Sequence, residues 1–288
     1  MASQKFKQFK VDFYVVTLDQ DRTTSVLKDM LSAADGITDA LTLNAGEDEH
    51  FQIRSIVSIN KGMAYKAVFG RCRFGETPEQ GAVDGREADV ELKPGHGLVE
   101  KNYFLFFPET NLVVYQRNSS GSHYSKFQRY LGRASGHDGV TFEPILTSDS
   151  YERLLTPGVQ AKRVDISFQQ PKDPSLYRQA WTKDAIRLVN SAGGVTARIT
   201  IGVGRTHGKL LSQAKDAAVM LARAGLAKVA RVKVEEQNEP IDLIADRVVE
   251  TAQALIGDNG RPIPEMVYAA LDRAKTKRKK DLDTFFGT

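Results

Sequence analysis

The segment from Asn102 to Arg117 constrains the fold more than any other part of the chain. Two apolar runs, Asn102 to Phe107 and Leu112 to Arg117, flank the sequence Pro108-Glu109-Thr110-Asn111. Apolar runs of strand length that are joined by a short turn rich in Pro and Asn are typical of a β-hairpin. We therefore predict an antiparallel strand pair here, which requires a sheet in the first half of the chain.

The rest of the first half has the pattern of a mixed α/β unit. Strand segments are rich in β-branched and aromatic residues, whereas helix segments place their apolar residues on one face. Strands are expected at Lys10 to Leu18, Phe51 to Ile59, Gly62 to Phe74 and Val140 to Leu146, and helices at residues 23–33 and 124–131.

Beyond Thr156-Pro157-Gly158 the pattern becomes that of a smaller layered module. Strands are expected at Lys162 to Gln169, Thr196 to Val203 and Leu226 to Glu235, with helices at residues 175–192 and 209–224 between them. The β-α-β-α-β order predicts one small α/β layer structure. The predicted fold class is α+β, with a mixed-sheet globular domain and a smaller basic module at residues 159–235.

Two segments near the C-terminus are assigned by different patterns. Residues 241–256 carry an apolar stripe at helical spacing, yet Val248 to Ile256 also alternates as a strand would, so helix and strand both remain open. Pro264 is favourable at the first position of a helix, and this last helix is predicted to run to about Asp283.

Charge is strongly segregated along the chain, although the net charge is only +4. The segments Thr17–Asn60 and Glu76–Glu100 each carry a net charge of −5, whereas Ala161–Glu235 carries +9 and Leu271–Lys280 carries +5. Such blocks create surface potentials that attract a partner of opposite sign. A solvated basic surface without a partner is the simplest alternative, but phosphates are the partners that best use charge of this size.

Several classes of chemistry find no support in the sequence. His50, His96, His123, His137 and His207 lack metal-ligand spacing, and Cys72 is the only cysteine. We therefore expect no catalytic residue, metal or cofactor, although an enzyme stays open as an alternative. The N-terminus has no apolar signal core and no segment is long and apolar enough to span a membrane, so a cytoplasmic location is expected.

The loop from Gly202 to Lys209 follows a predicted strand and opens a predicted helix, as a phosphate-binding loop does. Val203 and Leu210 stand where a P-loop requires Gly and Ser or Thr, which argues against nucleotide hydrolysis. Backbone N–H groups at a helix N-terminus could still bind one phosphate beside Arg205, His207 and Lys209. A plain connector is the equal alternative.

A second basic element lies at the end of the last predicted helix. With no helix-turn-helix or zinc finger visible, contact with the nucleic-acid backbone is expected, with little sequence preference. Charge alone assigns the candidate DNA-binding residues: Arg198, Arg205, His207, Lys209, Lys215, Arg231, Lys233, Lys275, Lys277, Arg278, Lys279 and Lys280.

The order of these segments resembles the RexA family of phage-encoded exclusion proteins and its relatives in prophage and antiphage defence. The similarity runs along most of the chain and is carried by FYVVTL, the hairpin FLFFPETNLVVYQRNSSG, FQRYLGR, VTFEPIL, VDISF, TARITIGVG and PIPEMVYAALDRAK.

The resemblance implies a homodimer that binds double-stranded DNA with little sequence specificity and works beside a membrane-protein partner in phage exclusion. It also implies that residues 1–158 and 236–288 form one discontinuous globular domain, with the module at residues 159–235 inserted in it, and it favours a strand at Val248 to Ile256. Two other functions remain alternatives: a metal-dependent nuclease that uses the acidic loops, and an interaction protein whose basic block binds the acidic block of another copy or partner.

Overall fold

The predicted hairpin forms two adjacent strands, β7 (Leu98–Phe107) and β8 (Leu112–Arg117). The turn is closed by Asn111, whose φ of 51° is one that Asn adopts more readily than most residues. The computed structural model describes residues 5–18, 25–33, 41–44, 49–75, 79–137, 139–155, 160–169, 187, 191–192, 194, 196–203, 210, 212–223, 227–234 and 240–288. By their contacts they divide into two units: residues 1–141 with 249–277, and residues 142–248 with 278–288.

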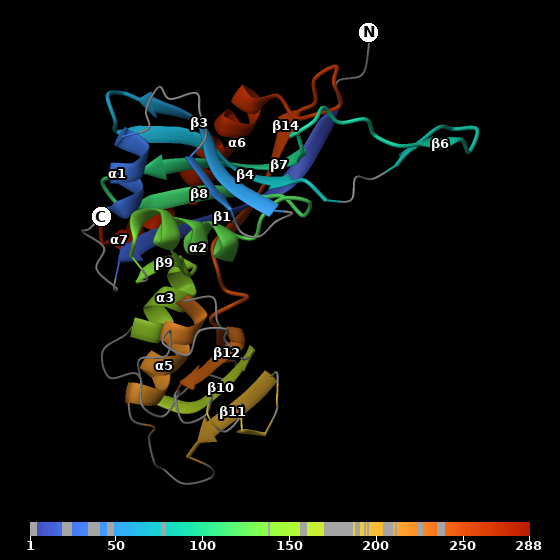
Figure 1. The fold of residues 1–288 in the computed structure, drawn as a ribbon. Coiled ribbons are helices and arrows are strands. Elements are labelled where there is room, and N and C mark those ends of the chain that lie inside the picture. The colour runs from blue at the N-terminus through green and yellow to red at the C-terminus, as the bar shows by residue number, and fades with distance from the viewer. Residues whose placement is uncertain are drawn as a thin grey trace. The chain divides into compact units, whose positions relative to one another are not determined.

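The larger unit is built on an eight-stranded sheet in the order β14-β1-β8-β7-β4-β3-β2, with β9 also paired to β1 (Figure 1). The neighbours along this order whose registers are given run antiparallel. The remaining strands are β1 (Phe6–Leu18), β2 (Leu41–Asn44), β3 (Glu49–Ile59), β4 (Ala64–Arg73), β9 (Val140–Pro144) and β14 (Val249–Leu255), and a separate hairpin pairs β5 (Gln80–Gly81) with β6 (Glu87–Ala88).

Helices cover both faces of this sheet. Along β7, Phe104 packs against Phe127 of α2 (Tyr124–Ser135), with ring centroids 5.0 Å apart. The neighbouring Tyr103 meets Tyr268 of α6 (Pro264–Lys277) edge to face at 5.4 Å. Because successive strand residues point to opposite faces, α2 and α6 lie on opposite sides. The third helix of this unit, α1 (Val26–Ala33), buries Val26, Leu27 and Leu31.

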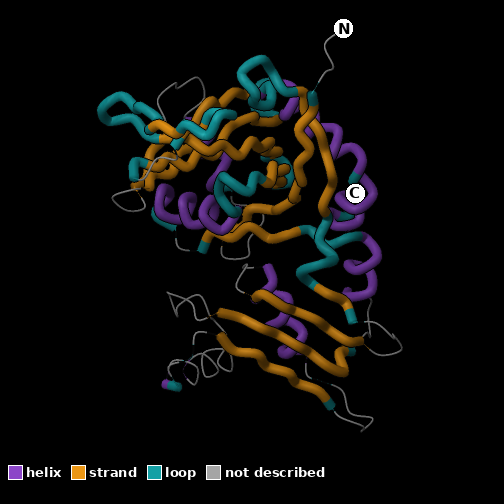
Figure 2. The backbone as a smooth tube through the Cα atoms, turned by 90° about the vertical axis from the view of Figure 1, so that its right-hand side faces the viewer, coloured by secondary structure: helices purple, strands orange, loops and turns teal. Residues whose placement is uncertain are grey.

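The smaller unit contains an antiparallel sheet in the order β11-β10-β12-β13, and α5 lies against one of its faces (Figure 2). Its elements are α3 (Ser148–Leu155), β10 (Ala161–Gln169), β11 (Thr196–Gly202), α5 (Ser212–Arg223), β12 (Ala227–Val234), β13 (Ile241–Asp242) and α7 (Lys279–Phe286). The predicted helix at residues 175–192 falls largely outside the described residues.

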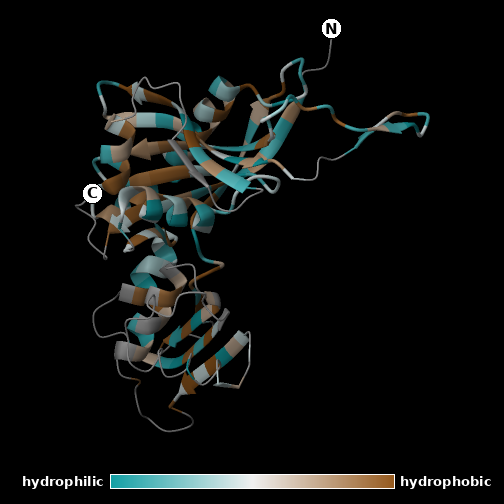
Figure 3. Ribbon diagram, viewed as in Figure 1, coloured by the Kyte–Doolittle hydropathy of each residue, from teal (hydrophilic) through white to brown (hydrophobic). Residues whose placement is uncertain are grey.

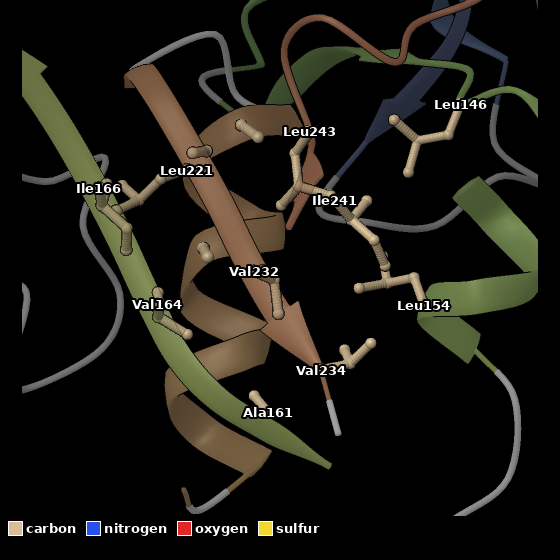
Figure 4. Packing of buried hydrophobic residues seen from close by; sticks show 13 residues of the cluster. Leu146, Leu154, Ala161, Val164, Ile166, Leu221, Val232, Val234, Ile241 and Leu243 are labelled. Atoms are coloured by element: carbon tan, nitrogen blue, oxygen red, sulfur yellow. The ribbon is translucent and has the colours of Figure 1, made fainter. Parts of the chain in front are cut away.

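One hydrophobic cluster holds the smaller unit together (Figure 4). Val164 and Val232 of the sheet pack with Leu221 of α5, and Leu146 and Leu154 join the same cluster. Since these last two precede residue 159, the contacts place the boundary at residue 141 instead of 158, and at 249 instead of 236. Helix α3 adds Leu154 to this core, and the sequence pattern did not predict it.

The chain therefore has the mixed α+β fold that the sequence predicted. The segment that fitted both patterns is a strand, β14, at the edge of the large sheet. The prediction of one helix from Pro264 to about Asp283 was wrong. Arg278 has φ −95° and ψ 14°, which interrupts the helix between α6 and α7. No Gly or Pro marks this break, so the residue pattern gave no warning of it.

Candidate nucleic-acid interface

The sheet of the smaller unit has one buried face and one exposed face. Along β10, Val164 and Ile166 are buried in the hydrophobic cluster, and the residues between them point the other way. Figure 3 shows hydrophilic and hydrophobic residues alternating along these strands. The face opposite α5 therefore carries Arg163 and Asp165 of β10 together with the matching residues of β11 and β12.

Strand register brings four cations together on this exposed face. Arg163 lies opposite Lys233 of β12, and Asp165 lies between Thr200 of β11 and Arg231 of β12. Arg198 is opposite the next outward residue of β10, Ser167. All four cations have solvent-accessible side chains. We call this set the basic sheet face: Arg163, Arg198, Arg231 and Lys233.

A nearly buried carboxylate orients one of these arginines. Asp165, which is only 7% exposed, accepts hydrogen bonds from Arg198 through Nε at 2.9 Å and Nη2 at 2.5 Å, and from the Thr200 hydroxyl at 3.3 Å. The hydrogen bonds from Arg198 hold the pKa of Asp165 below its usual range. The Arg198 side chain itself remains 61% exposed, so the paired guanidinium still faces solvent.

A second carboxylate holds Arg231. The Nε of Arg231 donates to Asp242 Oδ2 at 2.8 Å, and the backbone N–H groups of Ile244 and Ala245 donate to Oδ1 of the same residue, each at 3.0 Å. Burial alone would raise the pKa of Asp242, but these hydrogen bonds outweigh it and the pKa lies below its usual range. Four cations thus face two carboxylates, which leaves this surface positive.

The excess positive charge belongs to Arg163 and Lys233. These side chains occupy directly opposed positions on β10 and β12. Among the residues that the structure describes, neither forms an ion pair with a carboxylate, although Arg163 is close enough to Asp165 to help lower the pKa of that carboxyl group. Like charges placed directly opposite each other on neighbouring strands destabilise a sheet, so this pair is an electrostatic cost that folding alone does not require.

Sequence reasoning identified three of the four residues of this face. It placed Arg231 and Lys233 on one side of a strand and included Arg198, but it missed Arg163. The signal was available in the alternation of Lys162 to Gln169. It became useful only with the register, because nothing in the sequence shows which residue of β12 lies opposite Arg163.

The other described candidates lie away from this face. Lys215 is on α5, on the covered side of the sheet, and its Nζ is 3.5 Å from the backbone oxygen of Leu154. In the larger unit, Lys275 lies over the Phe107 ring at 4.3 Å, and Lys277 is 3.7 Å from a carboxylate oxygen of Glu250.

Three more candidates lie at the start of α7, in the smaller unit. Arg278 is 3.6 Å from Asp281, and Lys279 forms an ion pair with Asp283. Lys280 is exposed. The basic run that looked continuous in the sequence is thus divided between two helices and partly neutralised by local carboxylates. Arg205, His207 and Lys209 lie outside the described residues.

Comparison with protein families identifies the chain at the level of its family. A family model of unknown function matches residues 4–280, which is nearly the whole length. The chain belongs to the DUF6731 family. The search of curated proteins returns no match. The family of this DUF6731 member therefore carries no assigned activity.

Two further properties of the structure concern metals and membranes. In the described parts of this DUF6731 chain, no three side chains of His, Cys, Asp or Glu gather in a way that could hold a metal ion. In the same parts of the chain, no helix is both long enough and apolar enough to cross a membrane.

Proposed function

We propose that this protein binds double-stranded DNA through the sugar-phosphate backbone, with little sequence preference, and that the basic sheet face is a principal contact surface. The observation that carries the proposal is the opposed pair Arg163 and Lys233. Two adjacent cations repel each other and lower the stability of the sheet. A phosphate that lies between or above them would neutralise this repulsion. Backbone contact of this kind gives affinity and does not read sequence.

The arginines on the same face are already held by carboxylates in orientations that suit phosphate binding. A carboxylate that binds Arg198 through two hydrogen bonds fixes the plane of its guanidinium, yet leaves other N–H groups directed to solvent. Fixing the group beforehand reduces the entropy that binding would otherwise cost. The four side chains of the face come from three adjacent strands, so the sheet itself sets their spacing.

The resemblance to the RexA family supports the wider setting of this proposal. In that setting the protein is a cytoplasmic homodimer that acts in phage exclusion or antiphage defence, beside a membrane-protein partner. The segregated acidic and basic blocks of the chain agree with self-association, since they give one copy surfaces that attract another.

A titration of labelled duplex DNA at two salt concentrations tests the function directly. If about six phosphates are neutralised, affinity should fall roughly a thousandfold between about 50 and 200 mM salt. Scrambling the duplex sequence should change affinity by less than about tenfold, because phosphate contacts carry no sequence information. A response that is flat in salt would exclude a backbone-binding protein.

Variants of the basic sheet face show whether this surface is responsible. Arg163→Gln with Lys233→Gln should weaken duplex binding at both salt concentrations. The matched control, Lys28→Gln with Arg129→Gln, removes the same charge from solvent-accessible positions on α1 and α2 and should bind DNA more nearly like the wild type. Incubation of the DNA with Mg²⁺ or Mn²⁺ in parallel tests the nuclease alternative, since cleaved product would establish an enzyme.

A further inference from the structure

The outer edge of the large sheet forms a groove together with helix α6. Strand β14 is the last strand of the sheet order, and α6 packs beside it. The groove has a volume of about 370 Å³. It is lined by Gln8, Glu250, Thr251, Ala252, Gln253, Ala270, Arg273, Ala274 and Lys277.

Some backbone N–H and C=O groups of β14 point away from β1, toward the groove. The N–H of Ile256 donates to the carbonyl oxygen of Lys5 at 2.8 Å, so the even-numbered residues of β14 are those that bond to β1. Bonded and non-bonded residues alternate in an antiparallel pair, so Thr251 and Gln253 direct their backbone groups away from β1. An exposed edge beside a helix is the geometry in which extended segments add as a further strand.

The groove is basic and has small side chains in it. Arg273 and Lys277 are exposed on α6, and Glu250, which lies 3.7 Å from Lys277, is the one carboxylate in the lining. The alanines at positions 252, 270 and 274 give the groove a small, apolar wall, in which Ala270 and Ala274 are buried. An extended segment with acidic groups on one side and apolar groups on the other would match both features.

The chain itself has such a segment on the β5–β6 hairpin. Residues 79–97 carry five carboxylates against two cations, and the residues from Gln80 to Asp89 are exposed throughout. Val83 at its turn is fully exposed. After β6 the sequence alternates Asp89, Val90, Glu91, Leu92, which in an extended conformation places the acids on one side and the apolar residues on the other. We call residues 79–97 the acidic arm; in Figure 1 its strand β6 lies away from the sheet.

We propose that the β14–α6 groove receives the acidic arm of a second copy of this chain, and that two copies exchange arms reciprocally. This inference rests on the homodimer in the proposed function and names its interface. In the dimer, Asp89 and Glu91 lie against Arg273 and Lys277, and the arm adds a strand beside Thr251 and Gln253. Because each copy supplies one arm and one groove, the assembly closes with two-fold symmetry and leaves no arm unpaired.

Charge-swapped variants test this interface. The arm variant is Asp89→Lys with Glu91→Lys, and the groove variant is Arg273→Glu with Lys277→Glu. Each should weaken dimerisation by at least about a hundredfold, because like charges then face each other across the contact. An equimolar mixture of the two should form dimers again, since both contacts of the mixed pair join opposite charges. One chain that carries all four changes should also dimerise.

The outcomes separate this inference from the proposed function. Mass measurement by light scattering, without DNA, gives the oligomeric state, and circular dichroism verifies folding. If the arm and groove variants remain dimers, or if their mixture stays monomeric, the interface is wrong although a homodimer can stand. A monomeric wild type would overturn both the interface and the homodimer. Duplex titration of the wild type judges DNA binding separately.

A matched control guards against a general effect of charge reversal. Lys28→Glu with Arg129→Glu makes the same change in charge as the groove variant, at solvent-accessible positions of the larger unit outside the groove. This control should have the same mass as the wild type. If it also becomes monomeric, the loss of dimers in the groove variant reflects net charge, and the inference fails.

Discussion

Arg163 and Lys233 lie directly opposite each other on neighbouring strands of an exposed sheet face, so that two cations share one cross-strand position. The other two cations of this face each form an ion pair with a carboxylate: Arg198 with Asp165, and Arg231 with Asp242. The contrast matters because folding stability would favour a carboxylate at one of the two opposed positions, neither of which forms an ion pair among the described residues.

Lys233→Gln should therefore stabilise the protein and weaken the proposed DNA binding at the same time. Removing one of two directly opposed like charges should raise the free energy of unfolding by about 0.2–1 kcal/mol. The same change removes a cation from the basic sheet face and should lower the affinity for duplex DNA. Urea unfolding and DNA titration measure the two effects, with Arg129→Gln as the control for loss of one solvent-accessible positive charge. If the free energy of unfolding does not rise while the affinity for duplex DNA falls, the two opposed cations are not retained for DNA binding at the expense of stability.

The two paired arginines should differ in their effect on stability. Arg198→Gln leaves Asp165, which is 7% exposed, with the weaker hydrogen bond from Thr200 and the charge of Arg163 among the described interactions. Arg231→Gln leaves Asp242 with two backbone N–H donors. An unsatisfied carboxylate near the interior is costly, so Arg198→Gln should lower the thermal midpoint by about 2–4 °C. Arg231→Gln should lower it by less, and equal shifts would show that the extra donors at Asp242 have no effect.

The sequence predicted the elements better than it predicted their partners. The hairpin Asn102 to Arg117 and the strands of the smaller unit follow from local turn residues and from period-two alternation, which act within a few residues. The edge position of β14 follows from long-range pairing with β1. Its apolar residues suit either a strand or a helix, so only tertiary context decides between them.

The candidate site shows the same limit. Alternation alone places Arg231 and Lys233 on one face, because that rule is local. Grouping Arg163 with them requires the register of β10 against β12. The carboxylate partner of Arg198 is Asp165 and that of Arg231 is Asp242, and each comes from a different strand than its arginine. Net charge in the sequence also overstates the basic tail, since Lys277, Arg278 and Lys279 each meet a carboxylate in the fold.

The pair of Asp165 and Arg198 should make stability depend on pH in the acid range. Because the pKa of Asp165 is depressed in the folded state, its stabilising contribution is complete above the pKa of the unfolded residue, about 3.9. The contribution is lost as the pH falls through the folded pKa. The difference in thermal midpoint between the wild type and Asp165→Asn should therefore be constant from about pH 7 to pH 5 and shrink below about pH 4. A difference that stays constant down to about pH 3 would show that ionisation of Asp165 does not stabilise the fold.

The last prediction ranks the three basic elements in DNA binding, and it depends on how each cation is already engaged. Arg163 and Lys233 form no ion pair among the described residues, so each can release condensed counterions when it meets a phosphate. Arg163→Gln with Lys233→Gln should lower the slope of log affinity against log salt by about 2, close to 0.9 for each phosphate that is no longer neutralised. The tail variant, Lys277→Gln, Arg278→Gln, Lys279→Gln and Lys280→Gln, removes twice the charge. Three of its cations already face Glu250, Asp281 or Asp283, so its effect on the slope should be smaller.

The loop variant, Arg205→Ala with Lys209→Ala, should cost roughly 1–3 kcal/mol of binding free energy if these residues add charge-assisted hydrogen bonds to a phosphate at the glycine loop. Fluorescence anisotropy with one duplex across a series of salt concentrations measures all three variants in the same experiment. If the tail variant abolishes binding while the sheet-face and loop variants bind like the wild type, the smaller unit's sheet is not the contact surface. The basic run at residues 277–280 would then carry the DNA binding.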